Sequence, residues 1–497
     1  MQQLIPRERA APKTEDGSRA STALLSRPVL AVLTLLGIAA LVEITPGLER
    51  VRLFGAASGA ASEPAPAASA TLEVGEARLD TETNARPEMA QPEHFEAPRS
   101  PRGPIAKHSE ALPSIDVKRP PVPIIDSSGR ALDGFYAALE KSARKMPGAI
   151  TRIVHFGDSI IVSDYVSGTL RRKLQKQFGD AGHGFMLMAN AWPAYFHNDV
   201  YRYASAGWLV SRIVGPLSPD GWYGLGGVSF RAPPGSRARF GTARSGSFGR
   251  RVSRFTVLYL EEPGGGRFAL NLDGKPFAEA DTNAETKRVA RRELSVPDGE
   301  HELEVVTTKG NTRAFGVILE RDEPGVVLDA IGIQGARIRF LDKQDDQHWA
   351  DQLKARRPDL LVYQFGANES GDGFAYPMDQ YNQTMKDVLR QGKQAVPDAG
   401  CLVISAMDRA EKRGDSLSSM AVIPALVKEQ RAASAEVGCA FFDTFSAMGG
   451  PGSMPAWVQR GLGQADLTHP TGSGADVLAT WIYRALMDGY RTYLAKR

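Results

Sequence analysis

The sequence has little cysteine and almost no excess of charge of one sign. Its 497 residues include only 2 cysteines, which excludes a scaffold held by several disulfides and a cysteine-rich zinc module. The 60 lysines and arginines exceed the 57 aspartates and glutamates by a formal charge of only +3, which argues against a dedicated nucleic-acid-binding protein. Neither an HExxH motif nor a comparable metal-ligand spacing occurs among the 8 histidines, so we expect no metal and no cofactor.

Long apolar runs are scarce as well, and the one that stands out lies near the N-terminus. Residues 1–27 are polar, and the uncharged run Pro28–Val42 follows them. Taken as 28–48, the segment has about the length that crosses a membrane. Basic residues before it and few after it predict a cytoplasmic N-terminus and a body outside the inner membrane. The alternative is a cleaved secretory signal that leaves a secreted or periplasmic protein, and both interpretations export the rest of the chain.

Proline is concentrated in the next segment, 49–125. Between Pro64 and Pro123 there are 11 prolines, and the segment is otherwise rich in alanine and glutamate. Such a composition buries too little apolar surface to offset the entropy lost on ordering. We therefore expect a disordered linker between the membrane segment and a globular body.

From Leu132 onward the sequence alternates between strand and helix patterns. Short buried-strand runs occur at 153–156, 360–363, 402–404 and 439–442, and apolar residues recur every four positions from Val166 to Phe178. This alternation predicts an α/β domain with a parallel, doubly wound sheet. Its two parts are 126–190 and 325–497.

The alternation stops between 191 and 324. Short β-type runs at 228–231, 254–260, 268–272, 288–296, 301–307 and 314–320 are separated by turn signals such as Asp273-Gly274. This spacing predicts a β-sandwich, and because the α/β pattern resumes afterwards, the sandwich is an insertion. We expect the insertion to be separable from the chemistry of the flanking parts.

A candidate nucleophile follows the first predicted strand. In Gly157-Asp158-Ser159, the serine lies at a strand-to-helix turn, where its Oγ projects above the carboxyl edge of the sheet. A serine nucleophile needs a base and a group that orients the base. Asp466-Leu467-Thr468-His469 supplies both, because the short spacing lets the aspartate fold back onto the imidazole.

Two further features of the sequence bear on this chemistry. Asn368, in Gly366-Ala367-Asn368, also follows a predicted strand, and its amide can donate a hydrogen bond to an oxyanion. Among the other histidines, we expect His155 to be a satisfied core group. Four more lack a partner at a useful spacing: His183, His197, His301 and His348.

The four blocks together resemble those of SGNH (GDSL-type) hydrolases, in the same order. They are Gly157-Asp158-Ser159, Gly335 within Gly332-Ile333-Gln334-Gly335-Ala336, Gly366-Ala367-Asn368 and Asp466–His469, and the resemblance covers about 152–185 and 328–490. It implies a flavodoxin-like SGNH hydrolase fold with Ser159 as nucleophile, His469 as base and Asp466 as its orienting group. It also implies an oxyanion hole made by the N–H groups of Ser159 and Gly335 and the side chain of Asn368.

Finer features are similar to bacterial peptidoglycan O-acetylesterases. They are Phe178–Phe185, Asn368–Asp372 and the Gly449–Gly452 loop, and that group also carries a carbohydrate-binding-like β-sandwich after the first block. One difference is Ile160, which follows the serine where that group commonly has histidine. This difference leaves the identity of the substrate open.

The insertion has an uneven charge pattern. No acidic residue occurs from Gly221 to Leu260, whereas seven arginines do, Arg231, Arg237 and Arg239 among them. One interpretation is a groove for an anionic glycan, in which arginines pair with carboxylates and Trp222 stacks on a sugar. The other is an ordinary solvated strand face.

Cys401 and Cys439 each begin a predicted strand, so they are either disulfide-bonded neighbours or two free buried thiols.

The N-terminal segment predicts an exported, membrane-tethered protein. The resemblance implies that it is a serine esterase that removes O-acyl groups, expected to be acetyl, from an envelope polysaccharide such as peptidoglycan. An alternative is a polysaccharide O-acetyltransferase of the same fold, which would need a partner to supply the acetyl donor. A further alternative is an inactive glycan-binding protein, against which the complete set of Ser159, Asp466 and His469 argues.

Overall fold

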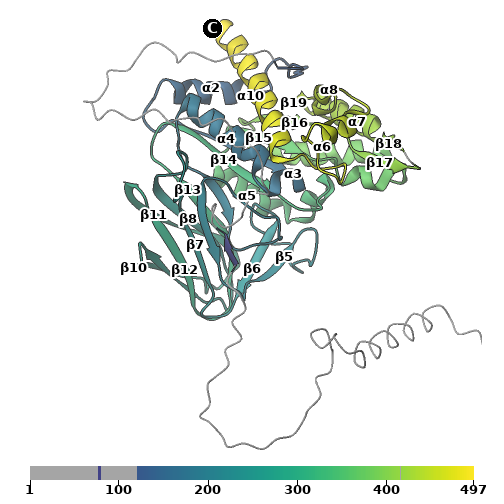
Figure 1. The fold of residues 1–497 in the computed structure, drawn as a ribbon. Helices are drawn as coiled ribbons and strands as arrows, with labels where there is room; N and C mark the ends of the chain where they lie inside the picture. Colours follow the sequence, from purple (N-terminus) through teal and green to yellow (C-terminus); the bar gives the residue numbers. More distant parts are fainter. Residues whose placement is uncertain (1–76, 80–119, 415) are drawn as a thin grey trace, which may run out of the picture. The chain divides into compact units, whose positions relative to one another are not determined.

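A computed structural model describes residues 77–79, 120–414 and 416–497 of the chain (Figure 1). The predicted membrane segment at 28–48 and most of the predicted linker at 49–125 lie outside the described residues. Among the residues that the structure does describe, no helix is long and apolar enough to cross a membrane.

The α/β part is built on a five-stranded sheet in the order β14-β2-β15-β16-β19, in which every neighbouring pair is parallel. The strands are β2 (Ile150–Gly157), β14 (Gly325–Gly332), β15 (Leu360–Gln364), β16 (Gly400–Ile404) and β19 (Ala440–Phe442). Numbered along the chain within this sheet, the order is 2-1-3-4-5, which is that of flavodoxin-like doubly wound folds. The predicted α/β class with a parallel sheet is confirmed.

Helices cover both faces of this sheet, which is why its strands are almost continuously apolar. Ile153 packs into one cluster with residues of α2 (Asp133–Ala143), α4 (Tyr165–Phe178) and α10 (Gly472–Ala495). Its neighbour Val154 points to the other face, in a cluster with residues of α5 (Asp346–Arg356), α6 (Met378–Ala395) and α7 (Val422–Val437). The period of two along the strand thus sends alternate side chains to two separate helix layers.

Shorter elements follow the carboxyl ends of the strands. After β2 comes α3 (Ser159–Val162), after β14 the 3₁₀ helix η2 (Ile338–Lys343), and after β15 the 3₁₀ helix η3 (Glu369–Ala375). A small hairpin, β17 (Ala410–Arg413) and β18 (Ser416–Ser419), follows β16, and α8 (Thr444–Met448) and α9 (Ser453–Gln459) follow β19.

The segment between the two α/β parts forms two antiparallel sheets, as expected for an inserted sandwich. One has the order β1-β4-β7-β12-β9-β10, and the other β11-β8-β13-β6-β5 with β3 also paired to β13. Tyr259 of one sheet and Phe268 of the other have ring centroids 6.0 Å apart, so the inner faces pack on each other. The strands are β3 (Gly184–Leu187), β4 (Val200–Ala204), β5 (Leu209–Arg212), β6 (Val228–Ala232), β7 (Arg237–Thr242), β8 (Val252–Glu261), β9 (Arg267–Leu272), β10 (Lys275–Asp281), β11 (Arg288–Gly299), β12 (Glu302–Lys309) and β13 (Thr312–Glu320).

Two details concern the segment boundaries. The short strand β1 (Ala77–Leu79), within the predicted linker, pairs with β4 at the edge of one sandwich sheet. The strand β3, which precedes the expected boundary at Ala191, already belongs to the other sheet through its pairing with β13.

The sandwich and the α/β part share one hydrophobic core. The cluster that contains Phe156 and Trp349 of the α/β part also contains Phe230 and Val257 of the sandwich. Buried ion pairs cross the same boundary, because Glu320 at the end of β13 accepts hydrogen bonds from Arg152 of β2 and Arg356 of α5. The insertion is therefore continuous with the domain that it interrupts.

Candidate active site

Ser159 lies just beyond the carboxyl end of β2, at the sharp turn that the sequence predicts. The Asp158 side chain accepts a hydrogen bond from the Ile160 N–H at 3.1 Å and caps the first turn of α3. A Cβ on Gly157 would lie 2.4 Å from Cγ1 of Ile161, so only glycine lets the strand pass so close to the helix. The turn therefore holds Ser159 at the edge of the sheet.

His469 and Asp466 reach Ser159 from a loop before α10. Oγ of Ser159 lies 2.8 Å from Nε2 of His469, and Nδ1 of His469 lies 2.6 Å from Oδ2 of Asp466. The second carboxylate oxygen of Asp466 accepts the N–H groups of Thr468 and His469, both at 3.0 Å. The structure thus brings together the three residues that the sequence predicts for catalysis.

The protonation of this group follows from its contacts. Burial raises the pKa of Asp466, but the hydrogen bonds from His469 and Thr468 outweigh that effect and hold the pKa below its ordinary value. An ionised Asp466 only accepts hydrogen bonds, so Nδ1 of His469 carries the proton and donates it. Nε2 is then the free acceptor and takes the hydrogen bond of the Ser159 hydroxyl, as a general base must.

The predicted oxyanion donors come from three loops at the same edge of the sheet. Ser159 follows β2, Gly335 follows β14, and Asn368 follows β15. Within the described part of the chain, the N–H groups of Ser159 and Gly335 donate to no backbone acceptor and remain available. The Asn368 amide nitrogen donates one hydrogen to the Ala336 carbonyl oxygen at 2.9 Å, which leaves its second hydrogen for a ligand.

Glu369 couples two of these loops. Its Oε1 accepts the Ile338 N–H at 2.8 Å, so the loop after β15 holds the loop after β14 through Glu369 as well as Asn368. Glu369 and Asp158 are both buried, and each has one carboxylate oxygen without a hydrogen-bond partner. Burial raises the pKa of Asp158 to about 6 and that of Glu369 to about 7, and the charge of Asp158 raises the latter further.

Arg409 is a residue of this site that the sequence analysis missed. Its Nε donates to the Thr468 hydroxyl at 3.0 Å, and one Nη donates to the Ala367 carbonyl and the Ser370 hydroxyl at 2.8 and 3.0 Å. The guanidinium therefore ties the loop of His469 to the loop of Asn368. The only signal in the sequence was its position shortly after a buried strand, which many residues share.

The predicted substrate-binding residues come from different elements of the sandwich. Arg237 and Arg239 lie in β7, Arg231 lies in β6 of the opposite sheet, and Trp222 stacks on His348 with ring centroids 4.4 Å apart.

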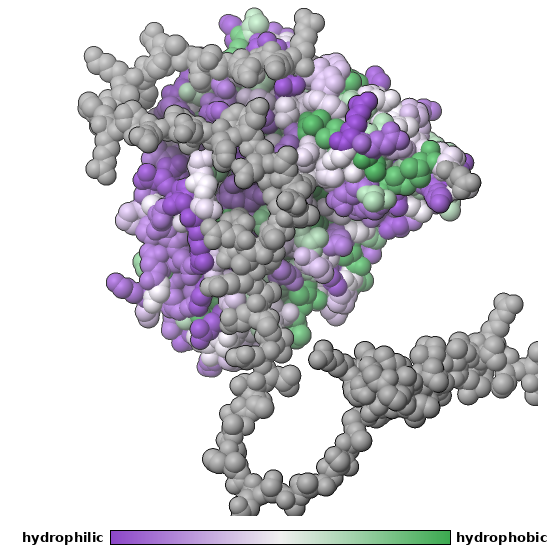
Figure 2. Space-filling view, viewed as in Figure 1, coloured by the Kyte–Doolittle hydropathy of each residue, from purple (hydrophilic) through white to green (hydrophobic). Residues whose placement is uncertain are grey.

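Carboxylates from other strands face these arginines. Oε1 of Glu262 lies 2.7 Å from Nη1 of Arg231. Oε1 of Glu304 lies 3.0 Å from Nε of Arg239 and 3.9 Å from Nη1 of Arg237. The positive charge of the acid-free stretch is thus balanced by carboxylates from elsewhere in the sequence. The surface of the sandwich over β10–β12 is mostly hydrophilic (Figure 2).

The buried histidines are partnered. As expected, His155 is a core group, and its Nε2 lies 3.1 Å from Oε1 of Gln364. His183 and His197, for which the sequence showed no partner at a useful spacing, are paired in the structure, with Nε2 of His183 2.9 Å from Nδ1 of His197. The two histidines are 14 positions apart, with β3 between them, and no motif in the sequence marks the pair.

These two histidines and Asp164 place metal-ligating atoms within 4.8 Å of one another. The Asp164 carboxylate is already held by both Nη groups of buried Arg171, at 3.2 and 2.8 Å. The positive charge of Arg171 beside the carboxylate opposes a cation, so these residues do not fit a metal site.

A comparison with protein families identifies the α/β part. The model of the GDSL-like lipase/acylhydrolase family matches residues 299–477, which include Gly335, Asn368, Asp466 and His469. This part of the chain is similar to GDSL-type hydrolases. The resemblance to SGNH hydrolases and the expectation of an ester-hydrolysing enzyme are thereby confirmed. Ser159 lies outside the matched range, because the sandwich separates it from the later blocks in the sequence. In the folded chain it nevertheless lies beside His469.

Solved structures similar to the hydrolase chain include esterases. A peptidoglycan O-acetylesterase structure is 21% identical and has a TM-score of 0.64, covering 74% of this chain and 99% of its own. An acetylxylan esterase from Geobacillus stearothermophilus is 18% identical with a TM-score of 0.26, covering 33% of this chain and 73% of its own, a weak match. The first of these supports the fold, and the sequence matches no curated protein.

Proposed function

We propose that the protein is a serine esterase that removes O-acyl groups, chiefly O-acetyl, from a cell-envelope polysaccharide such as peptidoglycan. The observation that carries the proposal is the contact between Ser159 and His469, completed by Asp466. A hydroxyl hydrogen-bonded to an oriented imidazole is an activated nucleophile for an ester carbonyl.

In the first half of the reaction, Oγ of Ser159 attacks the carbonyl carbon of the ester, and its proton passes to Nε2 of His469. The carbonyl oxygen becomes an oxyanion, which the N–H groups of Ser159 and Gly335 and the amide of Asn368 stabilise. The His469 imidazolium, held by ionised Asp466, then gives its proton to the sugar oxygen as the C–O bond breaks. The sugar leaves with a free hydroxyl, and the acyl group stays on Ser159.

In the second half, a water molecule replaces the sugar. His469 takes a proton from the water, which attacks the acyl carbon, and the same donors hold the second oxyanion. Collapse of this intermediate returns the proton to Oγ of Ser159 and releases a carboxylic acid. These steps use the side chains and backbone N–H groups already described together with one water molecule.

A large substrate suits the exposure of this site. The side chains of His469 and Asp466 are 32% and 46% exposed, so an ester on a long polymer can reach them without entering a deep cavity. A peptidoglycan O-acetylesterase structure also shares the fold over 74% of this chain, which supports peptidoglycan as the polymer.

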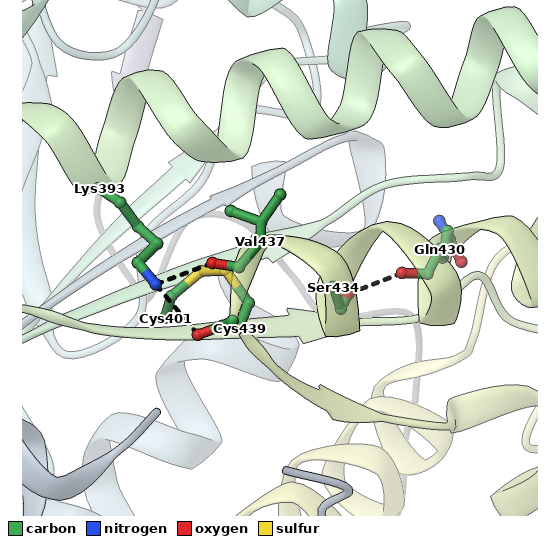
Figure 3. The surroundings of a disulfide bond; sticks show 7 residues. Lys393, Cys401, Gln430, Ser434, Val437 and Cys439 are labelled. Atoms are coloured by element: carbon green, nitrogen blue, oxygen red, sulfur yellow. Dashed lines mark hydrogen bonds between the residues drawn. A yellow bond between two sulfur atoms is a disulfide. The ribbon is translucent and has the colours of Figure 1, made fainter. Parts of the chain in front are cut away.

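We further propose that the catalytic body works outside the cytoplasm, tethered to the inner membrane through residues 28–48. Cys401 and Cys439 form a disulfide (Figure 3), and such bonds persist in oxidising compartments. The bond joins the second residue of β16 to the residue just before β19, its neighbour in the sheet, so the two thiols that the sequence left open are oxidised.

The proposal is tested by incubating the purified protein with O-acetylated peptidoglycan and measuring the release of acetate. Release by the wild-type protein, and none by Ser159→Ala, is expected. If no acetate is released and the acetyl group instead appears on an added acceptor sugar, the transferase alternative replaces the proposal.

A further inference from the structure

A cavity of about 330 Å³ lies where the sandwich meets the α/β part. Strands β8, β11 and β13 form one side, and the end of α5 with Arg152 of β2 forms the other. Its volume is within the ~300–1,000 Å³ of ordinary small-molecule sites. Because it needs both parts of the chain, no sequence motif marks it.

Arginines dominate the polar lining. Five arginines and only three carboxylates line the cavity. Three of the arginines converge on buried Glu320, whose carboxylate accepts from Arg152 at 2.9 Å, Arg254 at 2.6 Å and Arg356 at 2.6 Å. One carboxylate therefore holds three guanidinium groups in fixed positions.

Several donors of these arginines remain free. Among the described residues, Nη1 of Arg152 and Nε of Arg254 donate to no protein acceptor, and neither atom is buried. Arg357 makes no ion pair with another described residue. Nε of Arg291 lies 3.8 Å from Oε1 of Glu293, which is too far for a hydrogen bond. Fixed and free guanidinium donors around one space are suited to an anionic group, because arginine pairs with carboxylates by two parallel hydrogen bonds.

The rest of the lining is mixed. Leu258, Val289, Ala290 and Ile318 provide apolar surface, and Gln352 provides an amide. A sugar ring offers the matching combination of C–H faces and hydroxyl groups, which a simple inorganic anion lacks.

We propose that this cavity is a second, non-catalytic site that binds a carboxylate-bearing saccharide unit of the polymer. The inference rests on the proposed function, since it takes the polysaccharide to be the substrate. Arg152 and Ser159 are at opposite ends of β2, and seven residues at ~3.3 Å each separate them by roughly 23 Å. One polymer chain that occupies both sites is thereby held near the nucleophile between turnovers, so its effective concentration rises.

The experiment uses the full chain with Arg291→Glu and Arg357→Glu together, and Arg292→Glu as a matched control. Arg292 is the exposed neighbour of Arg291 on β11 and does not line the cavity. The KM for O-acetylated peptidoglycan should rise about tenfold in the double variant, with less than a twofold change in the control. The kcat/KM for a small acetyl ester should be unchanged in both, since neither arginine is near Ser159.

Binding is measured separately with Ser159→Ala in the same backgrounds. The probes are soluble peptidoglycan fragments with free carboxylates, the same fragments after amidation, and inorganic phosphate at equal ionic strength. Tighter binding of the free-carboxylate fragments, lost in the double variant, is expected. Equal binding of both fragments, or binding of phosphate alone, overturns the inference, whereas failure of the proposed function shows itself as no acetate release by the wild-type protein.

Discussion

Oγ of Ser159 and Nε2 of His469 lie 2.8 Å apart although 310 positions separate the two residues in the chain. If they act as one unit, Ser159→Ala and His469→Ala should each lower turnover by several orders of magnitude, and the double variant should be hardly slower than Ser159→Ala. Asp466→Asn should cost less than either. Steady-state kinetics with a small acetyl ester measures all four variants, and losses that multiply in the double variant would falsify the triad.

Substitutions of the oxyanion donors should differ in how much they lower kcat. Asn368→Ala removes a donor and should lower kcat by roughly 10²–10³ with little change in KM, because that bond strengthens as charge develops on the substrate oxygen. Gly335→Ala keeps its N–H, and no atom lies within 4 Å of the added Cβ, so crowding is not expected. Its φ of +78° strains any residue with a side chain by about 1 kcal/mol, which predicts that kcat falls tenfold or less. A KM effect larger than the kcat effect in Asn368→Ala contradicts this assignment.

Arg409 should act by positioning rather than by touching the substrate. Arg409→Gln should lower kcat about 10- to 100-fold, and Thr468→Val should lower it less, since each breaks one link between the two catalytic loops. A double-mutant cycle should show that the two losses do not add, because both act through the same hydrogen bond. Arg409→Lys should recover only part of the rate, as lysine lacks the forked geometry. Arg413→Gln, at the exposed end of the hairpin that begins just after Arg409, serves as the control and should leave kcat unchanged.

The buried Glu369 should make stability depend on pH. Its pKa is raised to about 7 in the folded protein by burial, against an ordinary value of 4.5. The folded state therefore holds the proton more tightly than the unfolded state does. The contribution of Glu369 to the free energy of unfolding is fully present below pH 4.5 and is lost as the pH rises through about 7.

Glu369→Gln does not titrate and still accepts the Ile338 N–H. Relative to the wild type, its free energy of unfolding should therefore be higher at pH 9 than at pH 4, by on the order of 3 kcal/mol. Urea unfolding at the two pH values measures the difference. A gain that is the same at both would show that the carboxyl does not titrate in this range.

Removal of 191–324 should abolish folding, contrary to the expectation from the sequence alone. The cut takes away the sandwich side of a continuous core and removes Glu320, leaving Arg152 and Arg356 buried without that carboxylate. Loss of a buried partner costs about 3–5 kcal/mol by itself. Glu320→Gln in the full chain should therefore lower the free energy of unfolding by about that amount while the small-ester kcat stays near wild type. Small-ester hydrolysis and a cooperative thermal transition that both survive the deletion would restore the idea of a separable insertion.

The sequence by itself determined many of the helices and strands and their order, but not β14 of the central sheet. The strands at 153–156, 360–363 and 402–404 and the six β-type runs of the insertion all lie within or overlap observed strands, because alternation and apolar runs record which faces are buried. Two of the four catalytic blocks, those of Ser159 and Asn368, were found for a related reason, since each follows a predicted strand. A residue at the carboxyl end of a parallel strand is placed at the site by topology alone, without knowledge of any contact.

Contacts between distant segments were decided only by the tertiary structure. Arg409 between the catalytic loops, the pairing of His183 with His197, and Glu320 beneath three arginines join residues that no local pattern relates. The arginine-rich stretch shows the same limit, since its partners at Glu262 and Glu304 come from other strands. Local periodicity specifies which side of an element is buried, but a charge or a hydrogen bond is satisfied by whichever group the fold brings within about 3 Å.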